Sequence, residues 1–327
     1  MKNTIRLYAV GGAGCNIAKL VEGTANNIEG MANLDICYVD TSLSNVRGEK
    51  VDENRFFKIE GDNLDGAAKI RKDSHPHLAK ALPKIMDKFR PTAFNIVVSS
   101  ASGGTGSVAA FHVVSEILKR GDNAVLILVG TTDSVQEITN TIATLKSFDG
   151  LAHSVGRPVA VHYLQNTQTA TRAVINNMAR QAIVMLSALM SNEHHELDTA
   201  DVKGWLNHSS IYPELVSVQF AQGQTEYNNA GEVITVATLA THDMVTAVDP
   251  VPAYQAVGYV PHSWTANNPP LIGKEPIHYT LSANMVSKVS GELNKLHDDL
   301  KSRQAAMTRR ERLTSTKDVD AGDGLIL

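Results

Sequence analysis

Two glycine-rich segments follow apolar runs at points where a strand would turn into a helix. The segment GGAGCN at 11–16 follows the apolar run 5–10, and ASGGTGS at 101–107 follows the run 95–98. Glycine lets the backbone approach an anion closely, and a helix N-terminus offers free N–H groups. The hydroxyls of Ser102, Thr105 and Ser107 would add further donors. Each segment therefore predicts a phosphate-binding turn, and the two together predict a nucleoside triphosphate.

Asp198 and Asp201 are spaced three residues apart. If a helix begins here, both carboxylates lie on one face and can address a single water molecule. That arrangement suits hydrolysis of a phosphoanhydride. Taken without the rest of the chain, the same two residues would more often be a helix N-cap and a solvated helix face.

Short apolar runs alternate with helical patterns in the first half of the chain. The runs are 5–10, 36–39, 96–98, 125–129 and 159–163, and such alternation predicts an α/β fold with a parallel sheet. Ligands bind such sheets at the carboxyl ends of the strands. Both glycine-rich segments lie there, Asp40 ends the second run, and the turn at 59–68 is a third candidate.

The second half of the chain has a different pattern. Residues 171–191 are apolar on nearly every side, which predicts a central helix buried between two domains. The runs 215–220, 233–239, 256–260 and 277–281 predict strands of a second, mainly β domain. A long helix from about 285 to 313 keeps 3–4 apolar spacing, which favours packing onto its own domain over a coiled coil.

Composition excludes several classes of function. The 327 residues are 43% apolar and 20% charged with a net charge of −4, which argues against a nucleic-acid partner. No run reaches the roughly 18 apolar residues of a membrane span, and no secretory signal is evident, so we expect a cytoplasmic protein. Two cysteines, Cys15 and Cys37, cannot form a disulfide framework or a cysteine zinc site. The cluster EHHE at 193–196 lacks HExxH spacing, so we expect no metal there.

Taken together, GGAGCN at 11–16, ASGGTGS at 101–107 and LDTADV at 197–202 resemble the signature set of the tubulin/FtsZ family in order and spacing. Ser102 stands where the family's GGGTGS signature has its first glycine. The segment 164–168, the pair Asn176-Asn177, the pair Gly204-Trp205 and the acidic tail most resemble the phage-encoded tubulins of the PhuZ type. The resemblance covers essentially the whole chain.

The resemblance implies a tubulin/FtsZ-like α/β fold in five parts. These are a parallel-sheet GTP-binding domain at 1–169, a central helix at 170–191, a smaller mixed α/β activation domain at 192–284, a long C-terminal helix at 285–313 and an acidic tail at 314–327. It also implies a GTPase that uses GTP/GDP and Mg²⁺ and polymerises head to tail into dynamic filaments. Such filaments would position phage replication material in the host bacterial cytoplasm, without membrane or direct nucleic-acid binding.

The family's site residues carry over position by position. The first phosphate loop would hold Gly11, Gly12, Gly14, Cys15 and Asn16, the second Asp40, the third Gly61, Gly66 and Ala67, and the fourth Ser102, Gly103, Gly104, Thr105, Gly106 and Ser107. Glu137 would reach the ribose, although the arginine usual nearby in FtsZ is not evident, and Asn166 and Asn176 would bind guanine. Glu196 stands where FtsZ proteins usually have asparagine.

On this resemblance, Asp198 and Asp201 would act on a neighbouring subunit. About 22 mostly helical residues separate Asn176 from Asp198, which places them about 25 Å apart at roughly 1.5 Å per residue. A contact between unlike ends of two subunits propagates into a filament, so hydrolysis would depend on assembly. The tail residues Asp318, Asp320 and Asp323 would dock on a basic surface of the next subunit, with Arg303, Arg309, Arg310 and Arg312 as candidate partners.

Two other functions stay open from the sequence. A Rossmann-type metabolic enzyme could bind a dinucleotide at the first loop, with Asp40 on a ribose; however, Ile17 stands where the third glycine of G-x-G-x-x-G belongs. A P-loop is not supported, because its GK[ST] is missing. A nucleotide-binding scaffold without hydrolysis is the other alternative, and Asp198 and Asp201 argue against it.

Overall fold

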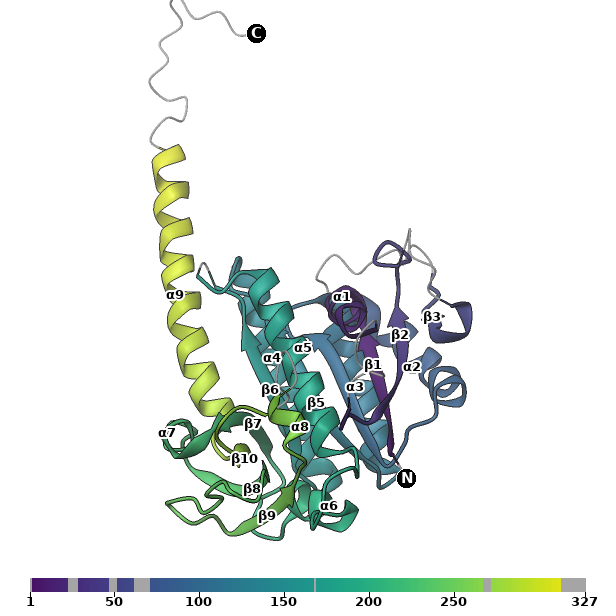
Figure 1. Ribbon diagram of the computed structural model, residues 1–327. Coiled ribbons are helices and arrows are strands. Elements are labelled where there is room, and N and C mark those ends of the chain that lie inside the picture. The colour runs from purple at the N-terminus through teal and green to yellow at the C-terminus, as the bar shows by residue number, and fades with distance from the viewer. Residues whose placement is uncertain are drawn as a thin grey trace, which may run out of the picture.

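The described strands form one ten-stranded sheet, and Figure 1 shows strands running across the body of the protein with helices around them. The computed structural model describes residues 2–22, 29–46, 52–61, 71–167, 169–266 and 272–312, apart from the side chains of 72–74 and 308–312. The strands are β1 (Thr4–Val10), β2 (Asn33–Asp40), β3 (Phe56–Lys58), β4 (Phe94–Ser100), β5 (Asn123–Gly130), β6 (Val159–Gln165), β7 (Leu215–Gln222), β8 (Val233–Ala240), β9 (Tyr254–Tyr259) and β10 (Ile277–Ser282). Their order across the sheet is β3-β2-β1-β4-β5-β6-β7-β10-β8-β9.

Helices cover both faces of the parallel part of the sheet. They are α1 (Gly11–Glu22), α2 (Arg71–Lys88), α3 (Gly104–Lys119), α4 (Val135–Val155), α5 (Arg172–Leu189), α6 (Thr199–Asn207), α7 (Gly223–Tyr227), α8 (Ser263–Ala266) and α9 (Met285–Arg312), with a 3₁₀ turn at Glu53–Arg55. One apolar core packs α1, α5 and α6 on the sheet, and the other packs α2, α3, α4 and the start of α9. Alternate residues of β1 enter the two cores, Leu7 in the first and Tyr8 in the second. The predicted α/β class is therefore confirmed.

The strands predicted for a second domain continue the first sheet. Strand β7 pairs in parallel with β6 from Val159↔Leu215 to Val161↔Ser217, and β10 lies antiparallel between β7 and β8. Strand β9 then pairs in parallel with β8. The sequence patterns place these strands correctly, but apolar periodicity carries no information on which strand pairs with which. The division into domains at 169, 191 and 284 stays a prediction.

The two long helices in the second half of the chain, α5 and α9, differ in how far they are buried. Helix α5 buries a stripe that includes Ile175, Ala179 and Ile183, whereas Val174 is 49% exposed and Met178 is 42% exposed. The expectation of burial on nearly every side is therefore wrong for this stretch of α5. Helix α9 packs on α4 through its first half, and Figure 1 shows its later turns running beyond the body of the protein. Among the described residues, no helix has both the length and the apolar character needed to cross a bilayer.

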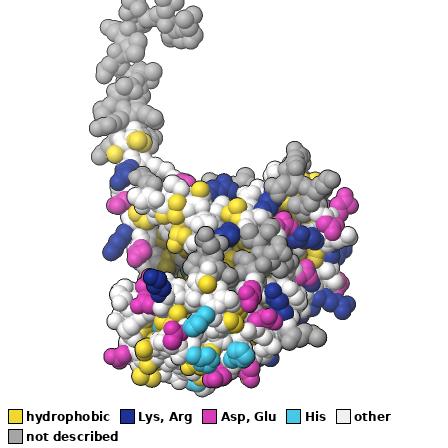
Figure 2. All heavy atoms as spheres, in the orientation of Figure 1, with side chains coloured by type: hydrophobic (Ala, Val, Ile, Leu, Met, Phe, Trp, Pro, Cys, Tyr) yellow, Lys and Arg dark blue, Asp and Glu magenta, His cyan; other side chains and the backbone are white. Residues whose placement is uncertain are grey.

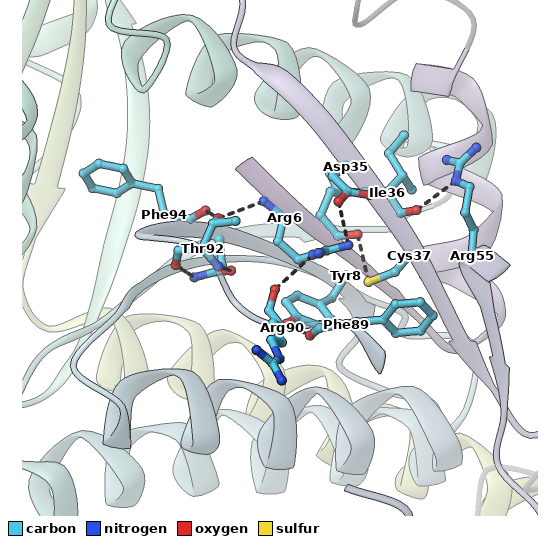
Figure 3. A network of polar contacts seen from close by, with 12 residues as sticks. Arg6, Tyr8, Asp35, Ile36, Cys37, Arg55, Phe89, Arg90, Thr92 and Phe94 are labelled. Carbon is cyan, nitrogen blue, oxygen red and sulfur yellow. Dashed lines mark hydrogen bonds and ion pairs between the residues drawn. The ribbon is translucent and has the colours of Figure 1, made fainter. Parts of the chain in front are cut away.

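Polar contacts tie the connection between α2 and β4 to the first two strands, as Figure 3 shows. Arg6 pairs with Asp35 at 2.8 Å and its Nε donates to the carbonyl of Arg90 at 3.2 Å. The Tyr8 hydroxyl donates to the carbonyl of Phe89 at 2.6 Å. Burial raises the pKa of the nearby Cys37 thiol, which therefore stays protonated. This network holds β1 and β2 against the connection between α2 and β4. It lies away from the glycine-rich turns, which follow the carboxyl ends of β1 and β4.

Candidate functional site

A cavity of about 680 Å³ lies at the carboxyl ends of β1, β4 and β5, and we call it the glycine cavity. It sits between β1 and β4, where the strand order reverses, which is the position at which open α/β sheets bind ligands. Its described lining includes Gly11, Gly12 and Ala13, then Asp40, Ser42, Ser44 and Asn45, then Ser100, Ser102, Gly103, Gly104, Thr105 and Gly106, and finally Thr131, Asp133, Glu137, Asn166, Thr167, Thr171, Arg172 and Asn176. A cavity of this size is ordinary for a small-molecule ligand.

Two helix N-termini meet at the floor of the glycine cavity. Gly11 has φ +69°, and a Cβ there would lie 2.8 Å from the Cα of Gly106, so the two turns can touch only as glycines. Gly103 is the N-cap of α3 and makes no side-chain cap hydrogen bond. Neither α1 nor α3 has an acidic residue in its first turn. In the second turn the N–H groups of Ser102 and Gly103 donate to the Ser100 hydroxyl. The N–H groups at the starts of α1 and α3 are therefore the ones that an anion can use, which is what a phosphate chain requires.

Hydroxyl groups fix the shape of the second turn. Ser102 is 3% exposed, and its hydroxyl lies 3.0 Å from that of Thr131 and 3.1 Å from that of Ser100. The Ser107 hydroxyl donates to the carbonyl of Gly103 at 2.6 Å, and the Thr41 and Thr105 hydroxyls lie 3.0 Å apart. Ser102, the residue that departs from the glycine of the family signature, is therefore held by protein partners at the rim of the turn.

Asp40 places a carboxylate beside the two glycine turns. It accepts hydrogen bonds from the backbone N–H of Thr41 at 2.8 Å and from Nδ2 of Asn45 at 3.1 Å. Burial nevertheless raises the pKa of the Asp40 carboxyl, because desolvation outweighs these hydrogen bonds. Asp40 and the hydroxyls of Ser42 and Thr105 offer hard oxygen donors of the kind that Mg²⁺ prefers. Among the described residues, no cluster of three or more His, Cys, Asp or Glu side chains could hold a metal ion.

Asn166 brings an unsatisfied polar atom to the opposite wall of the glycine cavity. Its Oδ1 is buried without a hydrogen-bond partner, while its backbone N–H donates to the carbonyl of Gly130 at 2.9 Å. Helix α5 starts on the same wall, with Thr171, Arg172 and Asn176 facing the cavity. A buried acceptor without a donor costs free energy until a ligand supplies one. The N–H groups of a guanine edge would do so, and the residues present therefore fit a guanine nucleotide.

The structure brings together most, but not all, of the predicted nucleotide residues. Gly11, Gly12, Asp40, Ser102, Gly103, Gly104, Thr105, Gly106, Glu137, Asn166 and Asn176 line the cavity, whereas Gly14, Cys15, Asn16, Gly61 and Ser107 do not. Gly14 packs α1 on the sheet, since a Cβ there would lie 2.3 Å from the carbonyl oxygen of Val98. Cys15 is fully buried in the core. Gly66 and Ala67 lie outside the described residues.

Several residues that line the cavity were missed from the sequence. Thr131 and Asp133 directly follow β5, Asn45 lies a short way past the end of β2, and Arg172 opens α5. Arg172 is the one cation among the described lining residues. The rule that ligands bind at strand carboxyl ends applies to β2 and β5 as well as to the glycine turns, and it would have found the first three. Arg172 stands at a helix start, which carries no comparable signal.

The other predicted site residues, Asp198 and Asp201, lie at the start of α6. Asp198 is the N-cap, and its Oδ1 accepts from the backbone N–H groups of Ala200 at 2.6 Å and Asp201 at 3.1 Å. Oδ2 of Asp201 accepts in return from the N–H of Asp198 at 3.0 Å, which completes a capping box. The N-cap alternative from the sequence is thus what the structure shows, and catalysis by this pair stays a prediction.

The glycine cavity and the start of α6 lie at opposite ends of α5. Arg172, at the first residue of α5, lines the cavity, and α6 follows about ten residues after Leu189 closes the helix. The 18 residues of α5 span roughly 27 Å at 1.5 Å per residue. Figure 1 shows α6 at the lower end of the molecule and α1 in the upper part of the body, below the projecting turns of α9. Figure 2 shows histidine and acidic side chains gathered at that lower end.

Comparisons with known proteins place this geometry in context. No family model matches the chain. A phage tubulin-like protein of Pseudomonas phage PhiPA3 is 26% identical over 98% of both chains. The solved structure of the phage tubulin PhuZ with GDP has a TM-score of 0.81 at 23% identity and covers 99% of this chain and 97% of its own. A protofilament of TubZ from bacteriophage PhiKZ has a TM-score of 0.78 at 22% identity, covering 98% and 95%.

Proposed function

Since the chain is a member of the tubulin/FtsZ family and is similar over 98% of its length to a phage tubulin-like protein, we propose that it binds GTP in the glycine cavity and polymerises head to tail. Hydrolysis of the GTP would then depend on assembly. One observation supports this most directly: the anion-binding turns and the paired carboxylates lie at opposite ends of α5. Neither end can complete the reaction within one subunit.

The glycine cavity would hold the nucleotide from three sides. The N–H groups at the starts of α1 and α3 would bind phosphate oxygens, and Glu137 would reach the ribose. Asn166 and Asn176 would hydrogen-bond the guanine edge, because an amide supplies both donor and acceptor. Mg²⁺, when bound, neutralises charge on the phosphate oxygens. Asp40 would face that cation, which also offsets the repulsion between its buried carboxylate and the phosphates.

Hydrolysis would be completed by the next subunit. The start of α6 in one subunit would lie over the glycine cavity of its neighbour, where carboxylate oxygens orient the attacking water toward the terminal phosphate. Such a contact joins unlike surfaces and leaves both ends of the pair open, so it extends into a filament. GTP hydrolysis would therefore follow the amount of polymer and not the amount of free protein.

Two finer predictions accompany this function. The first is that the acidic tail docks on the next subunit through Asp318, Asp320 and Asp323. These residues lie outside those that the structure describes, and so do the side chains of Arg309, Arg310 and Arg312. Positioning of phage replication material is the cellular task that the resemblance implies. Both stay predictions.

Light scattering of the purified protein with phosphate release followed in the same cuvette tests the proposal. We expect scattering to rise with GTP and Mg²⁺ above a threshold concentration, together with phosphate release, and not with GDP. A ligand response to NAD without assembly would favour the Rossmann alternative instead. Strand order does not separate the two, because β3-β2-β1-β4-β5-β6 is also the Rossmann order.

Asp198→Asn tests whether the carboxylate acts on a neighbour. Asparagine keeps the N-cap acceptor but removes the charge, so α6 should still form. We expect the variant to bind GTP and assemble, with hydrolysis per polymerised subunit reduced by about a hundredfold or more. The matched control is Glu193→Gln in the preceding loop. Hydrolysis by Asp198→Asn at the unmodified rate would contradict the proposed mechanism.

A further inference from the structure

A second cavity, of about 670 Å³, lies on the face of the sheet that α2, α3 and α4 cover, and we call it the Arg71 cavity. It is nearly as large as the glycine cavity, and the two have no described lining residue in common. Its size is ordinary for a small-molecule ligand. Its described lining consists of Arg71, His75 and Pro76 of α2, Val108 and Phe111 of α3, and Ser147 of α4.

Arg71 brings an uncompensated charge to this cavity. Its Nε is buried, and within the described part of the chain no hydrogen bond or ion pair is seen for its guanidinium. Burial lowers the pKa of Arg71, and no described carboxylate acts in the opposite direction. A guanidinium stays charged in proteins even so, and a buried charge without a counter-ion is costly. An anion bound in the cavity would remove that cost.

The other walls of the Arg71 cavity suit a flat apolar body. Phe111 lines the cavity beside Val108, and Phe148 lies against the Phe111 ring at 5.8 Å between centroids. His75 meets His112 of α3 edge to face at 4.8 Å between centroids, which ties α2 to α3. Aromatic rings pack favourably when they stack with an offset or meet edge to face. Phe111 and His75 can therefore hold an aromatic ligand.

A second buried polar atom lies beside this cavity. Nε2 of His112 is buried, and none of the described residues gives it a hydrogen bond. Burial, and to a smaller degree the charges of His75 and Lys119, lowers the pKa of His112, so the ring is neutral at pH 7. With its proton on Nε2, a neutral imidazole can donate to an anionic oxygen. It adds no second charge, so Arg71 favours a ligand that carries a single negative charge.

We propose that the Arg71 cavity binds a small organic carboxylate with a flat apolar body. A guanidinium and a carboxylate pair through two parallel N–H···O bonds, and the apolar walls remove the rest of the ligand from water. Val108 lies four residues after Gly104, which is about 6 Å along α3. The ligand would therefore lie against the same helix whose N-terminal N–H groups face the glycine cavity, in a site separate from the nucleotide.

Binding of 2-naphthoate to the full chain tests the proposal. This compound joins a carboxylate to a flat apolar body, whereas 2-naphthamide keeps the body without the charge and acetate keeps the charge without the body. By titration calorimetry we expect one 2-naphthoate per chain with a Kd on the order of 0.1 mM, and binding at least about tenfold weaker for both analogues. Saturating GDP should leave the affinity for 2-naphthoate unchanged.

Two variants test the residues. Arg71→Gln should weaken 2-naphthoate binding by about tenfold or more, because the counter-charge is lost, and should leave the affinity for 2-naphthamide unchanged. Arg90→Gln, at an exposed position just after α2, is the matched control. Ser147→Phe would fill the cavity from α4 and should abolish binding of both naphthalene compounds. Thermal unfolding without ligand checks that each variant folds, and Arg71→Gln should be no less stable than the unmodified chain.

Several results would overturn the proposal. These are no binding of 2-naphthoate, equal affinities for 2-naphthoate and 2-naphthamide, or an affinity of Arg71→Gln for 2-naphthoate equal to that of Arg90→Gln. Competition between 2-naphthoate and GDP would do so as well, because it would assign the binding to the glycine cavity. If Arg71→Gln does not fold, Ser147→Phe and the comparison of the two naphthalene compounds still decide.

Discussion

The start of α3 and the start of α6 differ in what their free backbone N–H groups can bind. Every helix begins with N–H groups that lack a partner within the helix. At α3 the N-cap is Gly103, which provides no side-chain acceptor, while at α6 the carboxylates of Asp198 and Asp201 satisfy these groups within the chain. The first arrangement leaves donors for an anion brought from outside. The second makes a stiff turn that presents a carboxylate outward, so the two ends are chemically complementary.

Gly11→Ala should have the largest effect on the anion-binding end. Alanine there would place a Cβ 2.8 Å from the Cα of Gly106 and would hold an unfavourable φ of +69°. We expect the turns to separate and the affinity for GTP and GDP to fall by about a hundredfold or more, or roughly 3 kcal/mol. Titration calorimetry with GDP measures this.

Gly150→Ala is the control for that variant. Gly150 is exposed in the interior of α4, and a Cβ there would meet nothing within 4 Å. We expect unchanged nucleotide affinity and a gain of about 0.5–1 kcal/mol in the free energy of unfolding from the better helix former. If Gly11→Ala bound GDP as tightly as Gly150→Ala, the contact between the two turns would not be needed for the ligand.

Asn166→Ala should weaken ligand binding without lowering the stability of the free protein. The buried Oδ1 has no partner in the free protein, so its removal should not lower the free energy of unfolding. GTP affinity should fall by about tenfold, because a guanine donor loses its acceptor. Thermal unfolding with and without GDP measures both effects, with the exposed Asn177→Ala as control. Equal losses in stability with and without GDP would contradict a role for Asn166 in nucleotide binding.

Glu196→Asn should have the smallest effect, and it belongs to the α6 end. Glu196 has φ +67°, a left-handed conformation that asparagine adopts more readily than glutamate. We expect the free energy of unfolding to rise by about 0.5–1 kcal/mol with GDP affinity unchanged. Glu193→Asn removes the same charge from an exposed position outside the left-handed region. Equal gains in urea unfolding for both variants would assign the effect to charge and not to backbone strain.

The sequence predicted the α/β fold because the apolar runs have the length and spacing of buried strands. It also found both glycine turns, since glycine next to a strand end has few other uses. It did not find that β7 pairs with β6, because pairing between strands is decided by long-range packing. It missed Arg172, which reaches the glycine cavity only because α5 starts beside the glycine turns.

Residue types and local spacing by themselves determined where helices could start and which starts could bind an anion or cap themselves. Local rules suffice for this, because the partners lie within a few residues along the chain. Only the tertiary structure decided that the glycine turns, which lie far from α5 along the chain, meet the start of that helix. It also decided that the phenol of Tyr254, 53 residues along the chain, meets Asp201. Those relations depend on strand pairing and side-chain packing over the whole chain, which no short segment encodes.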